Sequence, residues 1–446
     1  MKKAPDKMLT LFDSICIIVG TIVGAGVYET TPVVVACMGG WIGVMGVWLA
    51  GGMLALCGAL CYAELATTYP NQGGDVVYLT RAYGRRAGFL FGWGQLAIIR
   101  PGDIALMAFV FGRYASALYA PLPSMPALYA AAAVVVLTLI NVIGVRESKW
   151  TQDVLTVVKM AGLLFIAVAG LSAPGSAAPV NVVPFSGEGL KLALILVLFT
   201  YGGWNEMAYV AAEIRNPKKN IVRSLLLGTV IVMIFYLLAN GAFLHALGYE
   251  GVINSQAVAV DTVGTRLPRS AARVVAVIIC ISALGAVNGL VFTGARISYA
   301  LGSEHRLFHL LGHWNPLLGT PVAALILQGV LSLAIVLLAG SFIDTILYSA
   351  PAVWLFFLAT GSALFRLRRK EASRLRPFRV TGYPVIPLVF CVASGFMLYS
   401  SVSYAFRQRP VGLLVLSGVM LLGAALYWRS GTRMVRSGSG TEHGGI

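Results

Sequence analysis

Long apolar segments, separated by short polar ones, recur along the whole chain. A helix needs about 20 mostly apolar residues to cross the hydrocarbon core of a bilayer. Segments of this kind span residues 11–38, 41–65, 88–118, 127–145, 154–173, 190–211, 223–247, 271–300, 321–340, 343–365, 384–406 and 411–428. We therefore predict an all-α polytopic membrane protein with twelve transmembrane helices.

The composition supports lipid rather than water as the main solvent. Of the 446 residues, 58% are hydrophobic and 11% charged, against about a quarter charged in soluble domains. The six cysteines fall in apolar segments without C-x-x-C spacing, which favours inert thiols over a disulfide framework or a metal site. We expect no cofactor and no metal.

The net charge of +16 is concentrated in particular connections. Lys and Arg gather in residues 1–10, 81–86, 215–223 and 366–379, which all lie on one side of a twelve-span chain. By the positive-inside rule this side is cytoplasmic, and so are both termini. The charge is then a topogenic signal and not a nucleic-acid site. The first apolar segment is too long for a cleaved signal sequence, and the connections are too short to hold a catalytic domain.

Two of the apolar segments contain clustered glycines. Residues 20–26 read GTIVGAG and residues 199–205 read FTYGGWN. If segments 1–5 and 6–10 form two repeats, each repeat begins with an interrupted helix, which is the usual signature of a transporter binding site. Close helix packing at small residues is the alternative for either cluster taken alone.

Interrupted helices offer chemistry that suits a zwitterion. A half-helix starting after Gly26 directs unpaired N–H groups and a positive dipole end at the gap, which favours a carboxylate. The preceding half-helices end near Ile22 and Phe199, where free carbonyls would accept hydrogen bonds from an ammonium group. A carboxylate and an ammonium group together describe an amino acid.

Residues 20–28, GTIVGAGVY, resemble the span-1 motif of the amino acid-polyamine-organocation (APC) superfamily, in particular its L-amino acid transporter branch. Residues 199–205 and the following EIRNP at 213–217 resemble span 6 of that branch and the loop after it. Residues 62–65 and 287–289 are also similar. The chain therefore resembles a prokaryotic member of this branch.

The resemblance implies a LeuT-like fold, with two inverted five-helix repeats and two added helices. The chain would form one transporter domain over 1–446. Its parts would be a first repeat in 1–173, a second in 190–365, helices 11 and 12 in 384–428, and a cytoplasmic tail in 429–446. Spans 1 and 6 would be broken.

The resemblance also implies particular substrate contacts. Backbone amides that would bind the carboxylate belong to Ala25, Gly26 and Val27; carbonyls that would bind the amino group belong to Ile22, Phe199, Thr200 and Gly202. The Phe199 ring would form a thin outer gate. Beyond what the resemblance implies, we assign Asn205 and Glu206 to the binding site; the branch usually has an uncharged residue at the position of Glu206. Ala25 replaces the serine or similar residue of the family, so a hydroxyl contact is lost.

Lys159 is an ionisable residue within an apolar segment, where charge is costly unless paired or hydrated. One hypothesis is that its side chain snorkels to the cytoplasmic interface. The resemblance implies another, in which the ammonium replaces the sodium ion of coupled relatives and ties span 1 to span 8. Asn288 lies in the similar segment of span 8 and is grouped with Lys159 in coupling and gating. Transport would then be sodium-independent.

Glu29 and Glu206 follow the two helix breaks. They are candidates for receiving a cationic side chain, for carrying a proton, or for hydrogen bonding in a hydrated vestibule. Arg100 and Asp103 are spaced i, i+3 and are predicted to form a structural ion pair on one helix face.

Charged residues near the cytoplasmic ends suggest a gate. We expect Glu64 and Glu213 to pair with Arg81, Arg215 or a neighbouring loop arginine as an inner gate. The histidines spaced by four in residues 305–313 are predicted to lie on an amphipathic surface helix rather than in a metal site.

These observations predict sodium-independent transport or exchange of small amino acids by alternating access across a prokaryotic inner membrane. The alternative is a proton-coupled carrier of cationic amino acids or polyamines. An integral membrane enzyme or receptor is a distant alternative, because no catalytic motif such as H-E-x-x-H occurs. The loop 120–126 has no cysteine, so no disulfide-linked heavy subunit is expected as a partner.

Overall fold

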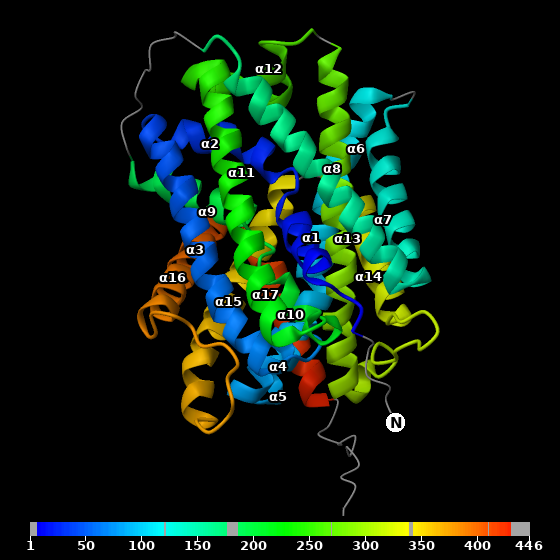
Figure 1. Ribbon diagram of the computed structural model, residues 1–446. Helices are drawn as coiled ribbons and strands as arrows, with labels where there is room; N and C mark the ends of the chain where they lie inside the picture. Colours follow the sequence, from blue (N-terminus) through cyan, green and yellow to red (C-terminus); the bar gives the residue numbers. More distant parts are fainter. Residues whose placement is uncertain are drawn as a thin grey trace, which may run out of the picture.

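The computed structural model describes residues 7–119, 122–175, 186–268, 270–338, 342–408 and 410–429. Within these ranges the chain is folded into helices, with two isolated β-bridges. Most of the predicted tail in 429–446 lies outside the described residues, as do Ala120 and Pro121 of the loop 120–126. Figure 1 shows the helices side by side in one bundle, with α4 and α5 at one end and α12 at the other.

The first half of the chain contains α1 (Leu11–Ile22), α2 (Gly26–Cys37), α3 (Trp41–Thr68), α4 (Asp75–Tyr83), α5 (Arg85–Gly94), the π-helix η1 (Gln95–Ile99), α6 (Arg100–Leu118), α7 (Met125–Ile143) and α8 (Val145–Leu171). The second half contains α9 (Gly187–Thr200), α10 (Glu206–Tyr209), the 3₁₀ helix η2 (Ala211–Glu213), α11 (Pro217–Asn254), α12 (Val258–Gly264), α13 (Ala271–Glu304), the 3₁₀ helix η3 (Arg306–Phe308), α14 (Val322–Leu338), α15 (Phe342–Lys370), α16 (Val385–Gln408) and α17 (Pro410–Arg429).

The helices are those of a polytopic membrane protein. Among the described residues, nine helices are long and apolar enough to cross a membrane, and the bent pair α1 and α2 makes a tenth. Large apolar side chains are exposed on the outer helices, as at Val136 and Leu139 on α7 and Val157 and Val168 on α8. Soluble monomers rarely expose such continuous apolar surface, whereas lipid covers it.

Local sequence explains where the first helix begins. Thr10 and Asp13 form a reciprocal capping box at the start of α1, which satisfies amide groups that the first turn leaves free. Just before this cap, Leu9 forms a parallel bridge with Ile214, which follows η2. The amide of Leu9 donates to the Glu213 carbonyl at 3.0 Å, and the amide of Arg215 donates to the Leu9 carbonyl at 2.8 Å.

A π-helical turn interrupts the helix formed by α5 and α6. The turn η1 ends at Ile99 and is followed by Arg100 and Pro101. Proline has no amide hydrogen and cannot continue the i to i−4 ladder of hydrogen bonds. The missing bond at Pro101 explains why the helix widens into a π-turn just before it. Such turns often lie at functional sites, and this one sets the direction of Arg100.

The histidine prediction is wrong. Residues 305–313 contain the short helix η3 and turns rather than an amphipathic helix. His305 is buried and packs edge-on against Phe89 at 4.8 Å between ring centroids, whereas His309 and His313 are both exposed. Their spacing of four therefore reflects no helical face.

Candidate functional site

Two interruptions of helical structure lie against each other inside the bundle. The first separates α1 from α2, whose axes differ by 47°, and the second separates α9 from α10. Gly203 in the second interruption has φ of +113°, and a Cβ there would lie 3.1 Å from Thr21 Cγ2 and 3.3 Å from the Ile22 amide nitrogen. A side chain at position 203 would strain the backbone and separate the two interruptions.

A cavity of about 130 Å³ lies at these interruptions. Its lining includes seven of the nine residues predicted to bind substrate: Ile22, Gly26, Phe199, Thr200, Gly202, Asn205 and Glu206. Ala25 and Val27 are fully buried beside Gly26 but do not line the cavity. The remaining lining includes residues of α5, η1, α6, α13 and α15.

The helix ends at the cavity carry the backbone groups that helices leave unpaired. Gly26 and Val27 are the first residues of α2, and no side chain caps that end; first-turn amides have no acceptor within their own helix. Ile22 and Thr200 are the last residues of α1 and α9, and carbonyls in a last turn have no donor within their own helix. The cavity therefore borders on the positive dipole end of α2 and on the negative dipole ends of α1 and α9.

A buried ion pair forms one wall of the cavity. Arg100 Nη2 lies 2.8 Å from Glu206 Oε1, and both residues are 3% exposed. The guanidinium also lies over the ring of Tyr209, 5.5 Å from its centroid. The predicted pairing of Arg100 with Asp103 is wrong, because the guanidinium turns from its own helix to α10; Asp103 lines the same cavity as a second carboxylate.

Lys159 joins three helices at the first interruption. Its Nζ donates to the carbonyls of Gly20 at 2.7 Å, Val23 at 2.8 Å and Ser282 at 3.0 Å, and the residue is 1% exposed. The snorkelling hypothesis is therefore wrong. Gly285 makes room for this side chain, because a Cβ there would lie 2.7 Å from Lys159 Nζ. A cation on α8 thus connects the end of α1 to α13.

Comparison with known proteins is consistent with this architecture. A family model described as amino acid permease matches residues 9–420. The chain belongs to the amino acid permease family. It is 32% identical to the b(0,+)-type amino acid transporter 1 of Mus musculus, over 98% of this chain and 92% of that protein.

Two further relatives of this permease are also similar over almost their whole length. It is 30% identical to the serine/threonine exchanger SteT of Bacillus subtilis (strain 168), over 95% of this chain and 96% of that protein. It is 31% identical to the cystine/glutamate transporter of Pongo abelii, over 96% of this chain and 87% of that protein. Family membership places the permease among amino acid transporters of cell membranes.

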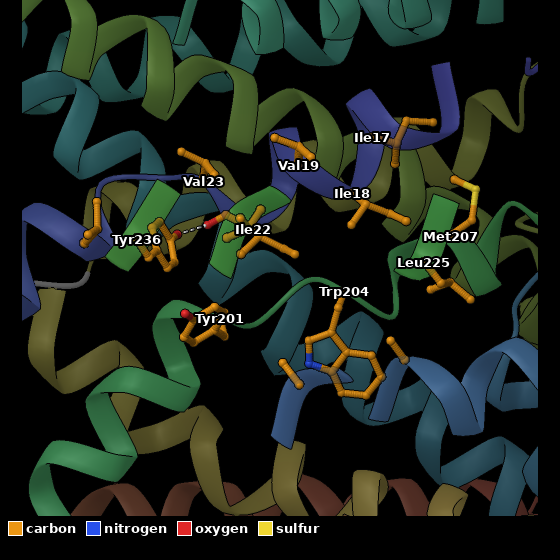
Figure 2. Close-up of a cluster of buried hydrophobic side chains, with 14 of the residues drawn as sticks. Ile17, Ile18, Val19, Ile22, Val23, Tyr201, Trp204, Met207, Leu225 and Tyr236 are labelled. Atoms are coloured by element: carbon orange, nitrogen blue, oxygen red, sulfur yellow. Dashed lines mark hydrogen bonds between the residues drawn. The ribbon is translucent and has the colours of Figure 1, made fainter. Parts of the chain in front are cut away.

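Tyr236 on α11 links the two helix interruptions and was not predicted from the sequence. Its hydroxyl lies 2.9 Å from the Ile22 carbonyl and 3.2 Å from the Thr200 carbonyl, as Figure 2 shows for Ile22. The ring packs against Tyr201 at 5.1 Å between centroids. A single hydroxyl donor thus serves the ends of both α1 and α9. A tyrosine inside an apolar segment carries no local signal of this role.

Glu29 does not share the cavity with Glu206. On α2 it forms an ion pair with Arg113 of α6, whose side chain is 58% exposed, and accepts a hydrogen bond from the Tyr114 hydroxyl at 3.3 Å. Figure 1 shows α2 toward the end of the bundle that carries α12. The two predicted carboxylates therefore occupy different places in the permease.

Asn288 on α13 is fully buried and does not line the cavity. Its amide nitrogen donates to Gln152 Oε1 at 2.9 Å, and its oxygen accepts from Asn141 at 2.8 Å. These bonds connect α13 to α8 and α7. Gln152 in turn donates to the Cys16 carbonyl on α1 at 3.3 Å, so Asn288 contacts the broken helix through one intermediate side chain.

Three buried carboxylates tie helices together at the end of the bundle that carries α4 and α5. We call the networks of Glu64, Asp75 and Glu213 the basal closure. Glu213 pairs with Arg296 at 2.9 Å, with side chains 1% and 0% exposed, and accepts from Gln72 at 3.0 Å. Glu64 pairs with Arg368 at 2.5 Å. Arg81 and Arg215 are not the partners of these carboxylates. The prediction of a neighbouring loop arginine is confirmed for Glu64, because Arg376 in the segment after α15 lies 3.6 Å from it, whereas Glu213 pairs with Arg296 on α13.

The third carboxylate, Asp75, connects the basal closure to the cavity. It accepts hydrogen bonds from the hydroxyls of Tyr62 at 2.6 Å, Tyr209 at 2.9 Å and Thr360. Tyr209 also accepts a bond from the Asn205 amide at 2.7 Å, and both Asn205 and Tyr209 line the cavity. A continuous chain of hydrogen bonds therefore runs from the cavity to α3, α4 and α15.

Proposed function

We propose that this permease carries out sodium-independent exchange or secondary transport of small amino acids by alternating access. The observation that supports it most is the meeting of both helix interruptions at one small cavity. The amides at the start of α2, at Ala25, Gly26 and Val27, would bind the substrate carboxylate. Carbonyls at Ile22, Phe199, Thr200 and Gly202 would accept bonds from its amino group.

The cavity volume supports a small substrate. An engineered protein cavity of about 150 Å³ holds one benzene molecule, which is similar in size to a small amino acid. A volume of about 130 Å³ is therefore close to what alanine or serine needs. Phe199, half-buried at the cavity wall, is suited to the role of a thin gate.

Lys159 supports independence from sodium. A cation site requires several oxygen ligands without a resident positive charge, and here an ammonium already takes three carbonyls between α1 and α13. Proton coupling through Lys159 remains compatible with this geometry, since a buried lysine can lose its proton. We group Asn288 with this coupling region and propose a gating role for Glu29 through its ion pair with Arg113.

The proposed architecture is a LeuT-like bundle. Its twelve spans would form repeats of five in 1–173 and 190–365, with both termini cytoplasmic. In that orientation the basal closure would face the cytoplasm. We expect no disulfide-linked subunit, so one chain in a lipid bilayer suffices for transport.

A second candidate, proton-coupled transport of cationic amino acids or polyamines, rests on one specific observation. Asp103 and Glu206 both line the cavity beside Arg100, so carboxylates outnumber guanidinium groups there. The pairing of Glu206 with Arg100 weighs against it, because a cationic side chain would have to compete with a guanidinium already in place.

The test is uptake of radiolabelled alanine into proteoliposomes at equal pH without sodium, with and without unlabelled amino acids trapped inside. Protein-free liposomes are the control. We expect uptake that requires internal amino acid. Uptake that needs a proton gradient and is inhibited by lysine would favour the second candidate. Absence of alanine, serine, leucine and lysine uptake under every condition would refute amino acid transport.

A further inference from the structure

The ion pair in the cavity wall leaves one donor and one acceptor without partners. Arg100 uses Nη2 and Glu206 uses Oε1 in their mutual contact. Arg100 Nη1 and Glu206 Oε2 are buried and have no hydrogen-bond partner among the described residues. Native interiors pair nearly all such atoms, and leaving them unpaired is costly. Both residues line the cavity, so a ligand bound there is a potential source of the missing partners.

The surroundings fix this pair in position. The stem of Arg100 passes Gly294, where a Cβ would lie 2.4 Å from Arg100 Cγ. Its Nε donates to Gln95 Oε1 at 3.4 Å, and Tyr209 lies under the guanidinium. The guanidinium therefore has little freedom to turn, and the two unpaired atoms keep a constant relation to the helix ends on the other side of the cavity.

The chemistry of the unpaired atoms selects one kind of side chain. A hydroxyl can donate to a carboxylate oxygen and accept from a guanidinium nitrogen at the same time. A methyl group does neither, an ammonium group only donates, and a carboxylate only accepts. The other walls are mainly apolar, including Leu106, Met107 and Leu290, although Asp103 also lines the cavity. Among the lining side chains, Arg100 and Glu206 place an unpaired donor and an unpaired acceptor on one ion pair.

We propose that Arg100 and Glu206 form a side-chain subsite that recognises the hydroxyl group of a small amino acid, serine or threonine. The inference rests on the proposed function, in which the helix ends hold the carboxylate and amino groups. It adds that the permease discriminates serine from alanine, because alanine leaves Arg100 Nη1 and Glu206 Oε2 unpaired. Sites built to hydrogen-bond a substrate hydroxyl strongly reject analogues that lack it.

The experiment measures dissociation constants for L-serine, L-alanine and L-lysine with purified permease in lipid nanodiscs. We expect the wild type to bind serine at least about 10-fold more tightly than alanine. In Glu206→Leu, which has no side-chain oxygens, the ratio should fall to about one. Glu188→Gln, which removes a carboxylate from an exposed ion pair with Lys191, is the matched control and should keep the wild-type ratio.

A second variant protects the test against misfolding. Glu206→Gln retains an oxygen for Arg100 but replaces the free acceptor with an amide donor, so the serine preference should fall at least about threefold. Equal binding of serine and alanine by the wild type, an unchanged ratio in both variants, or tighter binding of lysine than serine would overturn the subsite while amino acid binding stands. Absence of binding of all three would refute the proposed function itself.

Discussion

The cavity and the basal closure both contain buried charged groups but differ in how these are paired. In the basal closure, the carboxylates of Glu64, Asp75 and Glu213 each accept at least two hydrogen bonds from other segments. In the cavity, Arg100 and Glu206 share one contact, and each keeps an unpaired atom.

This difference separates two uses of buried charge. A buried ion pair with its hydrogen bonds complete holds segments in a fixed relation, because removing either partner leaves an uncompensated charge. A pair with free atoms beside a cavity can bind a ligand without breaking any existing contact. The basal closure is therefore suited to keeping one side shut, and the cavity to responding to substrate.

Breaking the basal closure should have the largest effect. Arg296→Met leaves the Glu213 carboxylate buried and unpaired and should lower the free energy of unfolding by about 3–5 kcal/mol. Thermal unfolding of the purified permease in detergent measures the change. The double variant Arg296→Met with Glu213→Leu should recover at least half of it. Arg113→Met, from the exposed pair with Glu29, should cost less than about 1 kcal/mol; an equal loss in both single variants would contradict the comparison.

Lys159 resembles the basal closure in being fully hydrogen-bonded, but it lies at the helix interruption that borders the cavity. Lys159→Met removes the ammonium group that three buried carbonyls share, although the Val23 carbonyl keeps its bond from the Ser282 hydroxyl. The change should lower stability by about 3 kcal/mol and abolish most uptake, because a buried group left without a partner costs about 1–3 kcal/mol. Gly285→Ala should act in the same direction by displacing the ammonium group. Uptake in proteoliposomes and thermal unfolding are the measurements, with Lys191→Met as the surface control. Full uptake by Lys159→Met would exclude a coupling role.

Tyr236 tests whether the two helix interruptions must stay together. Tyr236→Phe keeps the ring but removes the hydroxyl that reaches the Ile22 and Thr200 carbonyls. Losing a hydrogen bond that contributes a net free energy of about 0.5–1.5 kcal/mol should raise KM about threefold to tenfold. The exposed Tyr399 provides the control variant Tyr399→Phe, which should leave KM unchanged. An unaltered KM in Tyr236→Phe would show that the hydroxyl only supports packing.

The smallest effect is expected at Glu371, just outside the basal closure. Burial raises the pKa of its carboxyl, but the Tyr69 hydrogen bond and the charges of Arg81 and Arg374 outweigh this, so the pKa falls below its ordinary 4.5. A lowered pKa stabilises the fold above the unfolded-state value and loses that contribution as pH falls through the folded-state value.

Glu371→Gln should therefore cost at most about 1 kcal/mol at pH 7, because the partners are partly exposed. The difference from wild type should shrink below pH 4.5 and vanish at lower pH. Thermal unfolding at a series of pH values measures it. A difference that grew on acidification would mean that Glu371 is instead destabilised by its surroundings.

The sequence predicted those features that depend only on residues close together along the chain. Apolar length predicted helices such as 41–65, observed as Trp41–Thr68, and clustered glycines indicated where α1 and α9 end. Lys159 could be singled out because charge in an apolar segment is expensive.

Contacts between distant segments could not be predicted in this way. Arg100 was assigned to Asp103, three residues away, because only local partners are visible in a sequence; its true partner Glu206 is 106 residues distant. The roles of Tyr236 and Asp75 depend likewise on helices that meet only in the folded bundle.

The bridge between Leu9 and Ile214 has a consequence for biogenesis. Leu9 leaves the ribosome about 200 residues before Ile214 exists, a delay on the order of 10–40 s at usual synthesis rates. The donors that serve the end of α1, Lys159 and Tyr236, are also made later. The first apolar segment must therefore wait at the membrane without its partners, and its interruption can take final form only when the second half of the permease has been inserted beside it.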